Sequence, residues 1–230
     1  MDWPSKCAAV IPCFNEEAAI GSVVAETRRF LRTVLVVDDG STDRTVERAQ
    51  AARAATLRHG SNYGKGRALQ EGWRWARDHG FIWAMTLDGD GQHSADDIPS
   101  FLRCAEQTTA ALVIGNRMNG ASEMPWLRRV VNRWMSRRIS QAAGQLLPDS
   151  QCGFRLMNLE AWASLPISAS RFEIESDVLL AFLAAGQKVE FVPIQVLYKT
   201  EQSKIHPVWD TIRWFRWWKR VRGRAKIGEF

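Results

Sequence analysis

Two aspartates one residue apart are the first residues of this chain that could do chemistry. Asp88 and Asp90 lie in "LDGDGQH", at the end of the apolar run 81–87. Like charges this close repel each other unless a cation or a set of hydrogen-bond donors lies between them. Mg²⁺ and Mn²⁺ prefer oxygen ligands and keep positions open for substrate phosphates, and Gln92 could add a neutral oxygen. The alternative is a solvated turn, but the position after a buried strand favours a metal site.

A second acidic pair ends an earlier apolar run, in "VVDDGSTD". Asp38 and Asp39 end a predicted strand, where a carboxylate can accept hydrogen bonds from the base or ribose of a nucleotide. Ser41, Thr42 and Asp43, which follow, are typical helix caps. Only the two aspartates therefore indicate ligand binding.

A basic segment, "SNYGKGRAL", lies at the start of another predicted helix. Lys65 stands between two glycines, an arrangement that favours contact with an anion at the helix N-terminus. The GxxxxGK[ST] spacing of a P-loop is absent. The alternative is a plain helix start, with Lys65 and Arg67 solvated.

A later acidic segment, "RFEIESD", spaces Glu173, Glu175 and Asp177 by two residues. On a strand or a loop the three carboxylates would face one side and could include a general base. The alternative is a solvated acidic edge followed by a helix cap. Of the other reactive residue types, Cys152 is expected to be a small buried residue rather than a nucleophile, and His93 is expected in a surface turn.

The composition is that of a folded protein with an anionic partner. The 230 residues are 46% hydrophobic and carry a net charge of +6. Four cysteines without CxxC spacing argue against a disulfide framework or a zinc site and favour a reducing compartment. No signal peptide is evident, and no apolar run approaches the roughly 20 residues of a membrane-spanning helix.

Short apolar runs that alternate with helical patterns must position these residues. The expected fold is α/β, with a mainly parallel sheet covered by helices on both faces, because the strands are apolar throughout. Predicted strands are 7–12, 33–40, 55–59, 81–90, 111–117 and 152–158, with 188–199 as a strand pair or one long bent strand. Predicted helices are 15–31, with Asn15 as its N-cap, 41–53, 64–80, 94–107, 125–147 and 175–186. The polar motifs fall at strand ends, where ligands bind in such sheets, so one site is predicted.

The chain is expected to form one domain, residues 1–207, followed by a basic, tryptophan-rich helix, residues 208–230. In this tail Ile212, Trp214, Phe215, Trp218 and Val221 share one arc of the helix, and the opposite arc holds Arg213, Arg216, Arg220 and Arg224. Such a pattern is typical of an amphipathic helix in the membrane headgroup zone. Packing against the domain is the alternative, although so many tryptophans are hard to bury in so short a tail. No nucleic-acid motif is present, so nucleic acid is not an expected partner.

Together these segments resemble family-2 glycosyltransferases of the GT-A fold, close to the dolichyl-phosphate mannose synthase group. The resemblance rests on "VIPCFNEE", "VVDDGSTD", "NYGKGRAL", "LDGDGQH", "GNR", "DSQCGFR" and "SK" at 203–204. It implies a Rossmann-like sheet and the following roles: Pro12, Phe14 and Glu16 line the nucleotide pocket; Val37 and Asp39 meet the base; Asp88, Asp90 and Gln92 hold Mg²⁺ or Mn²⁺; Gly89 lies near the sugar nucleotide; Arg117 faces the phosphates or the acceptor; and Lys204 closes over the pyrophosphate. The chain departs from the family in carrying Lys199 at shorter spacing where an arginine is usual, and a lysine lacks the bidentate phosphate geometry of arginine.

The expected activity is therefore metal-dependent, inverting transfer of a hexose from a nucleotide-diphosphate sugar to a polyprenyl phosphate. Such an acceptor is already anionic and needs no strong base, and Arg117 together with Arg129, Arg133 and Arg137 could position it. A hydroxyl acceptor would instead need Glu173, Glu175 or Asp177 as a base. A sugar nucleotidyltransferase or a non-catalytic membrane adaptor would also be compatible with parts of this sequence. The expected location is cytoplasmic, at the inner face of the membrane through the tail, with a possible membrane-protein partner.

Overall fold

The computed structural model describes residues 1–118, 126–167, 169–197 and 207–221. Its helices and strands alternate along most of the chain, as predicted. In chain order they are α1 Trp3–Lys6, β1 Cys7–Cys13, α2 Ile20–Thr27, β2 Thr33–Asp38, α3 Thr45–Ala51, β3 Ala55–Arg58, α4 Lys65–Asp78, β4 Trp83–Thr86, the 3₁₀ turn η1 Ala95–Asp97, α5 Ile98–Thr108, β5 Leu112–Asn116, α6 Trp126–Ala143, β6 Arg155–Asn158, α7 Leu159–Ala163, α8 Ile174–Ala184, β7 Val189–Pro193 and α9 Pro207–Val221.

The described strands form one seven-stranded sheet in the order β3-β2-β1-β4-β6-β5-β7. β3, β2, β1 and β4 are parallel neighbours, and β5 is parallel to β7. β6 runs antiparallel to both β4 and β5. The predicted mainly parallel α/β fold is confirmed, and the carboxyl ends of β1, β2 and β4 meet at one edge of the sheet.

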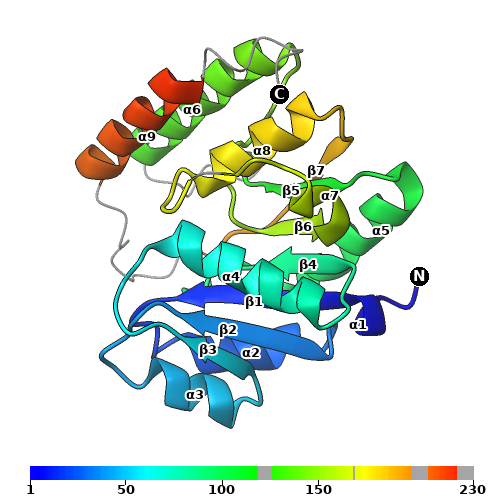
Figure 1. Ribbon diagram of the computed structural model, residues 1–230, viewed down its shortest axis with the longest axis vertical. Helices are drawn as coiled ribbons and strands as arrows, with labels where there is room; N and C mark the ends of the chain where they lie inside the picture. The colour runs from blue at the N-terminus through cyan, green and yellow to red at the C-terminus, as the bar shows by residue number, and fades with distance from the viewer. Residues whose placement is uncertain (119–125, 168, 198–206, 222–230) are drawn as a thin grey trace.

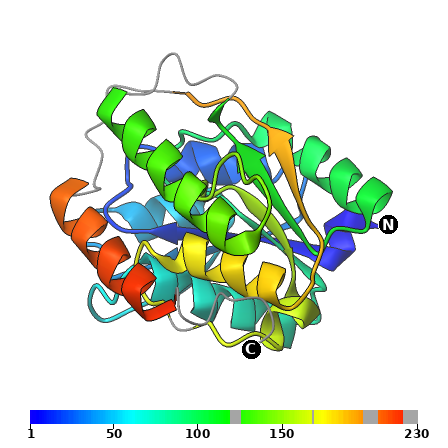
Figure 2. The same ribbon diagram turned by 90° about the horizontal axis from the view of Figure 1, so that it is seen from above.

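The strands are apolar throughout because helices cover both faces of the sheet. Every residue of β1 is buried, as is every residue of β4. Figure 2 shows α2 and α5 on one side of the sheet and α4 and α8 on the other. Gly72 lets α4 lie directly on the sheet, since a Cβ there would stand 2.4 Å from the Val10 side chain.

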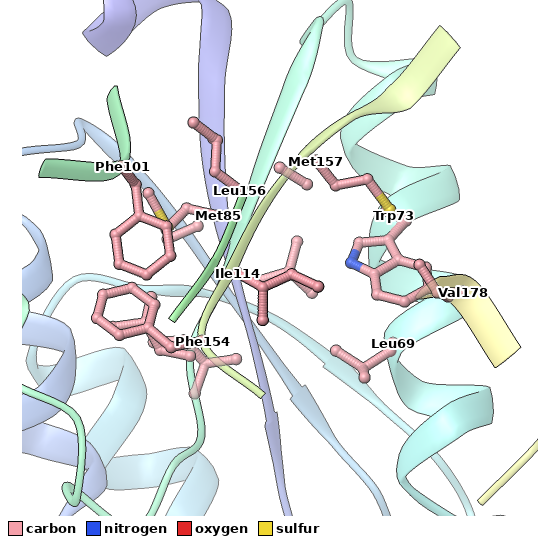
Figure 3. Packing of buried hydrophobic residues seen from close by; sticks show 14 of the residues in the cluster. Leu69, Trp73, Met85, Phe101, Ile114, Phe154, Leu156, Met157 and Val178 are labelled. Carbon is pink, nitrogen blue, oxygen red and sulfur yellow. The ribbon is translucent and has the colours of Figure 1, made fainter. Parts of the chain in front are cut away.

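The core continues on both sides of β4 and β6. Figure 3 shows Phe101 and Phe154 on one side of these strands and Trp73 on the other. The two phenylalanine rings stack with their centroids 4.3 Å apart. The indole N–H of Trp73 donates to Thr86 Oγ1 over 3.1 Å, so this buried polar group is satisfied.

The helices predicted from residues 15 and 41 begin later than their patterns indicated. The second begins at Thr45 with Arg44 at its N-cap, so the expected caps at 41–43 are wrong. The helix expected from residue 15 begins at Ile20, and Asn15 is not its N-cap. Asn15 has a φ of +54°, and its side-chain oxygen accepts from the Thr42 amide over 2.8 Å. The asparagine therefore ties the β1 loop to the β2 loop, a long-range contact that a local capping pattern cannot reveal.

The tail helix α9 packs on the domain beside α6 (Figures 1 and 2). Trp214 and Trp217 are only 3% and 1% exposed. The expectation that these tryptophans are hard to bury is wrong, because Trp214 packs against Trp134 of α6 and both indoles donate hydrogen bonds to α8. The assignment of faces is also partly wrong: Phe215 is exposed although its arc was expected to be apolar, and the side chain of Ile212 lies outside the described residues.

None of the helices described is long and apolar enough to cross a membrane.

Candidate active site

A lysine and two carboxylates from three different elements meet at the carboxyl edge of the sheet. Lys65, the first residue of α4, places its Nζ 2.6 Å from Asp88 Oδ1 and 2.7 Å from Glu175 Oε1. Asp88 follows β4, and Glu175 lies in the first turn of α8. Figure 1 shows the starts of α4 and α8 on the same side of the molecule. The motifs "GKG", "DGD" and "EIES" thus form one charged cluster.

A glycine of the "CGFR" segment makes this cluster possible. A Cβ on Gly153 would lie 2.8 Å from Asp88 Oδ2 and 3.0 Å from Lys65 Nζ. Contacts that short are repulsive, so any side chain at this position would push the two charged groups away. No role was predicted for Gly153, because its importance depends on groups from two distant segments.

The charges in the cluster stabilise one another. Burial by itself would raise the pKa of Asp88, but the Lys65 ammonium, with His93 and Arg117 nearby, holds it well below its ordinary value. Burial by itself would lower the pKa of Lys65, but Asp88 and Glu175 raise it above its ordinary value. Both groups are therefore charged at neutral pH.

The predicted metal ligands supply only part of the coordination shell of a hard dication. The main-chain N–H of Gln92 donates to Asp90 Oδ1 over 3.0 Å, which orients the Asp90 carboxylate within its tight turn. In the part of the chain that the structure describes, no three His, Cys, Asp or Glu side chains are grouped to hold a metal. Two carboxylates and an amide oxygen suit Mg²⁺ or Mn²⁺, which retain positions for phosphate oxygens and water. The residues therefore fit a cation whose remaining coordination positions are filled by substrate oxygens.

The aspartate expected at the nucleotide base is bound within the protein. Asp39 Oδ1 lies 2.8 Å from His59 Nδ1 and accepts from the Tyr63 amide, and Asp39 Oδ2 accepts from the Gly64 amide over 2.7 Å. His59 Nε2 lies 2.8 Å from Glu71 Oε2 on α4. Asp39 thus fixes the loop that leads to Lys65, a role that was not predicted because its partners lie 20 to 25 residues further along the chain.

An open hollow of about 460 Å³ lies beside Asp39, at the ends of β2 and β3. Its lining residues are Gly40, Ser41, Thr42, Arg58, His59 and Gly60. The volume is that of a small-molecule site.

The other expected pocket residues differ in access. Pro12 and Val37 are buried as neighbours in β1 and β2, so the Val37 side chain belongs to the core and only its main chain could meet a base. Phe14 is exposed and Glu16 is half-buried in the loop after β1. A Cβ on Gly89 would lie 2.5 Å from Cys13 Sγ, so this loop packs closely against the Asp88 turn.

Arg117 is fixed by a carboxylate that was not predicted as a site residue. Its Nε and Nη2 donate to Asp149 Oδ2 and Oδ1 over 2.7 and 2.9 Å. Asn132 Nδ2 and the Gln151 amide also donate to Asp149, each over 3.2 Å. Burial would raise the pKa of Asp149, but Arg117 holds it below its ordinary value. Most of the Arg117 guanidinium is therefore committed to Asp149, close to Asp88.

The polar residues that α6 turns inward are not its arginines. Asn132 and Ser136 are buried, and Ser136 Oγ lies 3.1 Å from Ser150 Oγ. Arg133 and Arg137 are exposed, and Arg129 is half-buried. The predicted spacing of these arginines is present, but it gives α6 a basic outer face.

The three carboxylates after Phe172 do not face one side. They belong to the start of α8, where a helical rather than a two-residue period separates them. Glu175 binds Lys65, whereas Asp177 accepts from the Ala169 amide over 2.8 Å and from Trp217 Nε1 over 3.1 Å. Glu173 is the N-cap residue of α8. The expectation of a shared face is wrong.

Two further predictions concern single residues. His93 is buried and stacked on Phe154, and burial lowers its pKa to about 4, so the expected surface turn is wrong. Cys152 is fully buried, and burial raises its pKa to about 12, in agreement with a structural rather than nucleophilic residue. Lys199, Ser203 and Lys204 lie outside the described residues.

Comparison with known proteins places this chain in a family. The sequence model of glycosyl transferase family 2 matches residues 8–164. The uncharacterized protein MJ1222 of Methanocaldococcus jannaschii is 32% identical over 200 residues, covering 84% of this chain and 82% of that protein. The UDP-N-acetylglucosamine–dolichyl-phosphate N-acetylglucosaminyltransferase of Methanococcus voltae is 29% identical over 217 residues, covering 84% and 86%.

Among solved structures, the fold is similar to that of glucosyl-3-phosphoglycerate synthase from Mycobacterium tuberculosis in complex with Mn²⁺, uridine diphosphate and phosphoglyceric acid. The TM-score is 0.74 at 19% identity, covering 97% of this chain and 78% of the other. This likeness confirms the expected GT-A type of fold, and the family match confirms the expected enzyme class. The chain belongs to glycosyl transferase family 2.

Proposed function

We propose that this chain transfers a hexose from a nucleotide-diphosphate sugar to a polyprenyl phosphate, with inversion at the anomeric carbon. The observation that carries the proposal is the contact of Asp88 with Lys65 at the sheet edge, over 2.6 Å. One group can bind a dication and the other a diphosphate, and both are charged at neutral pH. The dolichyl-phosphate named for the Methanococcus voltae relative supports the acceptor class.

Asp88, Asp90 and Gln92 would hold Mg²⁺ or Mn²⁺, which when bound supplies the positive charge that stabilises the departing nucleoside diphosphate. The Mn²⁺ and uridine diphosphate named for the Mycobacterium tuberculosis structure support this choice. The main-chain N–H of Gln92 donates to Asp90 Oδ1 over 3.0 Å and so orients this carboxylate. The donor would lie along the sheet edge, against the residues Pro12, Phe14, Glu16, Val37, Asp39, Lys65 and Gly89, with Lys204 in the closing segment.

The contacts of two of the three candidate bases favour a phosphate acceptor over a hydroxyl. A general base must be free to take a proton, but Glu175 is held by Lys65 over 2.7 Å and Asp177 is bound by Trp217 and the Ala169 amide, which leaves Glu173 as the candidate base for a hydroxyl acceptor. A lipid phosphate is already anionic and attacks without a base. Arg117, near Asp88, supplies a positive charge for either phosphate, and Arg129, Arg133 and Arg137 add a basic surface for the acceptor.

The test is a transfer assay with GDP-mannose, UDP-glucose and UDP-N-acetylglucosamine, each with polyprenyl phosphate and Mn²⁺ or Mg²⁺. Asp88→Ala and Asp90→Ala should lower the rate at least about a hundredfold, because the metal contributes about 3 kcal/mol or more to lowering the barrier. Asp78→Ala, an exposed aspartate at the far end of α4, is the matched control and should not change the rate.

The released product separates this activity from sugar nucleotidyl transfer, which would yield pyrophosphate instead of a nucleoside diphosphate. Full transfer in excess EDTA would contradict the metal role. Turnover of the donor with a hydroxyl acceptor but never with polyprenyl phosphate would contradict the acceptor class.

The proposed location is the cytoplasmic face of a membrane, where the lipid acceptor lies. The surface in support is the outer face of α6 and α9, which exposes Trp126, Val130 and Phe215 among basic side chains. These apolar groups can enter the headgroup region while the arginines meet acidic lipids. A membrane-protein partner stays a prediction.

A further inference from the structure

The Lys65 ammonium occupies one oxygen of the carboxylate that is expected to bind a metal ion. Its Nζ lies 2.6 Å from Asp88 Oδ1 and 2.7 Å from Glu175 Oε1, and Gly153 leaves room for these groups. The Asp88 side chain is 28% exposed, whereas that of Lys65 is 16% exposed. Asp88 is therefore the more accessible of the two groups to an ion from solvent.

A dication bound to Asp88 would lie close to the Lys65 ammonium, and the two positive charges would repel each other. The ion would therefore bind more tightly once Lys65 leaves Asp88. Lys65 has a flexible four-carbon stem, and it retains Glu175 as a second partner if it turns. It will leave Asp88 readily only when another anion replaces the lost contact.

A nucleotide diphosphate is such an anion, because a donor bound at this edge of the sheet would bring its phosphates to the start of α4 and to the Asp88 turn. We infer that Lys65 blocks Asp88 in the free enzyme and transfers its contact to the donor diphosphate, so that the metal enters together with the donor. This inference rests on the proposed function, because it assumes that Asp88 is a metal ligand. Lys65 then controls the order in which metal and donor bind, and Glu175 holds Lys65 in place.

The experiment measures Mn²⁺ binding rather than turnover. Free Mn²⁺ is titrated by electron paramagnetic resonance against wild-type protein and Lys65→Met, first without nucleotide and then with saturating UDP or GDP. Lys65→Met should bind Mn²⁺ at least tenfold more tightly than wild type without nucleotide, because two carboxylates lose their internal cation. The gain that the nucleotide gives to wild type should shrink in this variant.

Three variants separate competition from other effects. Lys65→Arg keeps the charge and should retain the weak binding of wild type. Lys188→Met removes an exposed lysine at the start of β7, far from Asp88 along the sheet, and controls for net charge. Lys65→Gln, which can hydrogen-bond both carboxylates, replaces Lys65→Met if that variant does not fold. Asp88→Ala added to Lys65→Met or Lys65→Gln should abolish the gained binding.

The possible failures are distinct. Equal or weaker Mn²⁺ binding by Lys65→Met and Lys65→Gln without nucleotide would overturn the inference about Lys65. If wild type binds no Mn²⁺ in an Asp88-dependent manner even with nucleotide, the metal site of the proposed function fails, and this inference fails with it. Asp88-dependent binding in wild type that is unchanged in the Lys65 variants would leave the proposed function intact and remove only the inference.

Discussion

At the scale of single residues, the charged groups of this site are held by partners rather than by solvent. Asp88 and Glu175 share Lys65, Arg117 is bound by Asp149, and Asp39 is bound by His59 and two amides. Buried charges persist only when they are paired in this way. Removing one partner should therefore lower the free energy of unfolding by more than the whole pair contributes to it.

The pair Arg117–Asp149 tests this expectation through the free energy of unfolding. Asp149→Asn leaves the buried Arg117 guanidinium without its counter-charge and should lower the free energy of unfolding by about 3–5 kcal/mol at pH 7. Urea unfolding followed by circular dichroism measures this loss. The matched control is Asp96→Asn, because Asp96 pairs with Arg29 at the surface and the change should stay within about 0.5 kcal/mol.

The stabilisation by Asp149 should also depend on pH. Because the folded-state pKa of Asp149 lies below its ordinary value of 3.8, the unfolded chain takes up a proton at this carboxylate first as the pH falls. The stabilisation by Asp149 is therefore complete above about pH 5 and is lost as the pH falls through 3.8 and below. The difference between wild type and Asp149→Asn should shrink over that range, and a constant difference down to pH 3 would contradict the assignment.

At the scale of elements, α9 is joined to α8 by two indole hydrogen bonds. Trp214 Nε1 donates to Ser176 Oγ over 3.0 Å, and Trp217 Nε1 donates to Asp177 Oδ1 over 3.1 Å. Ser176 and Asp177 directly follow Glu175, which binds Lys65. The tail helix thus packs against the segment that supplies one carboxylate of the site.

Trp217→Phe tests this attachment, since it keeps the aromatic packing but removes the N–H donor. The Asp177 carboxylate then lacks one buried partner, and the free energy of unfolding should fall by about 1–3 kcal/mol. Chemical denaturation monitored by far-UV circular dichroism reports the change. Trp126→Phe is the matched control, because Trp126 is 69% exposed and should tolerate the substitution. Equal stability of the two variants would show that α9 does not depend on this bond.

At the scale of the whole molecule, the net charge of +6 and the outer face of α6 and α9 favour acidic surfaces. The double variant Trp126→Ser with Phe215→Ser should bind vesicles containing phosphatidylglycerol several-fold more weakly than wild type, because less apolar area enters the headgroup region. Sedimentation with vesicles measures this, and binding should also weaken between about 50 and 500 mM salt. Ile82→Ser, an exposed apolar residue before β4 and outside α6 and α9, is the control. Undiminished sedimentation of the double variant would rule out this face.

The sequence by itself determined the fold class and predicted where the candidate site lies. Apolar runs such as 7–12 and 81–87, alternating with helical patterns, indicate a sheet covered on both sides, and polar motifs at the ends of parallel strands then meet at one edge. The types and spacing of Asp88, Asp90 and Lys65 were likewise sufficient to indicate a dication and a diphosphate. These inferences rest on local periodicity and on chemistry that each residue carries with it.

Only the tertiary structure decided which charges are partners. The pairs Lys65–Glu175 and Arg117–Asp149 join segments that are 110 and 32 residues apart, and no local pattern encodes such contacts. Three other features have the same origin. They are the antiparallel direction of β6, the burial of Trp217 and the different partners of Glu175 and Asp177. Each depends on which neighbouring surface removes a side chain from water, and that surface exists only when the whole chain has folded.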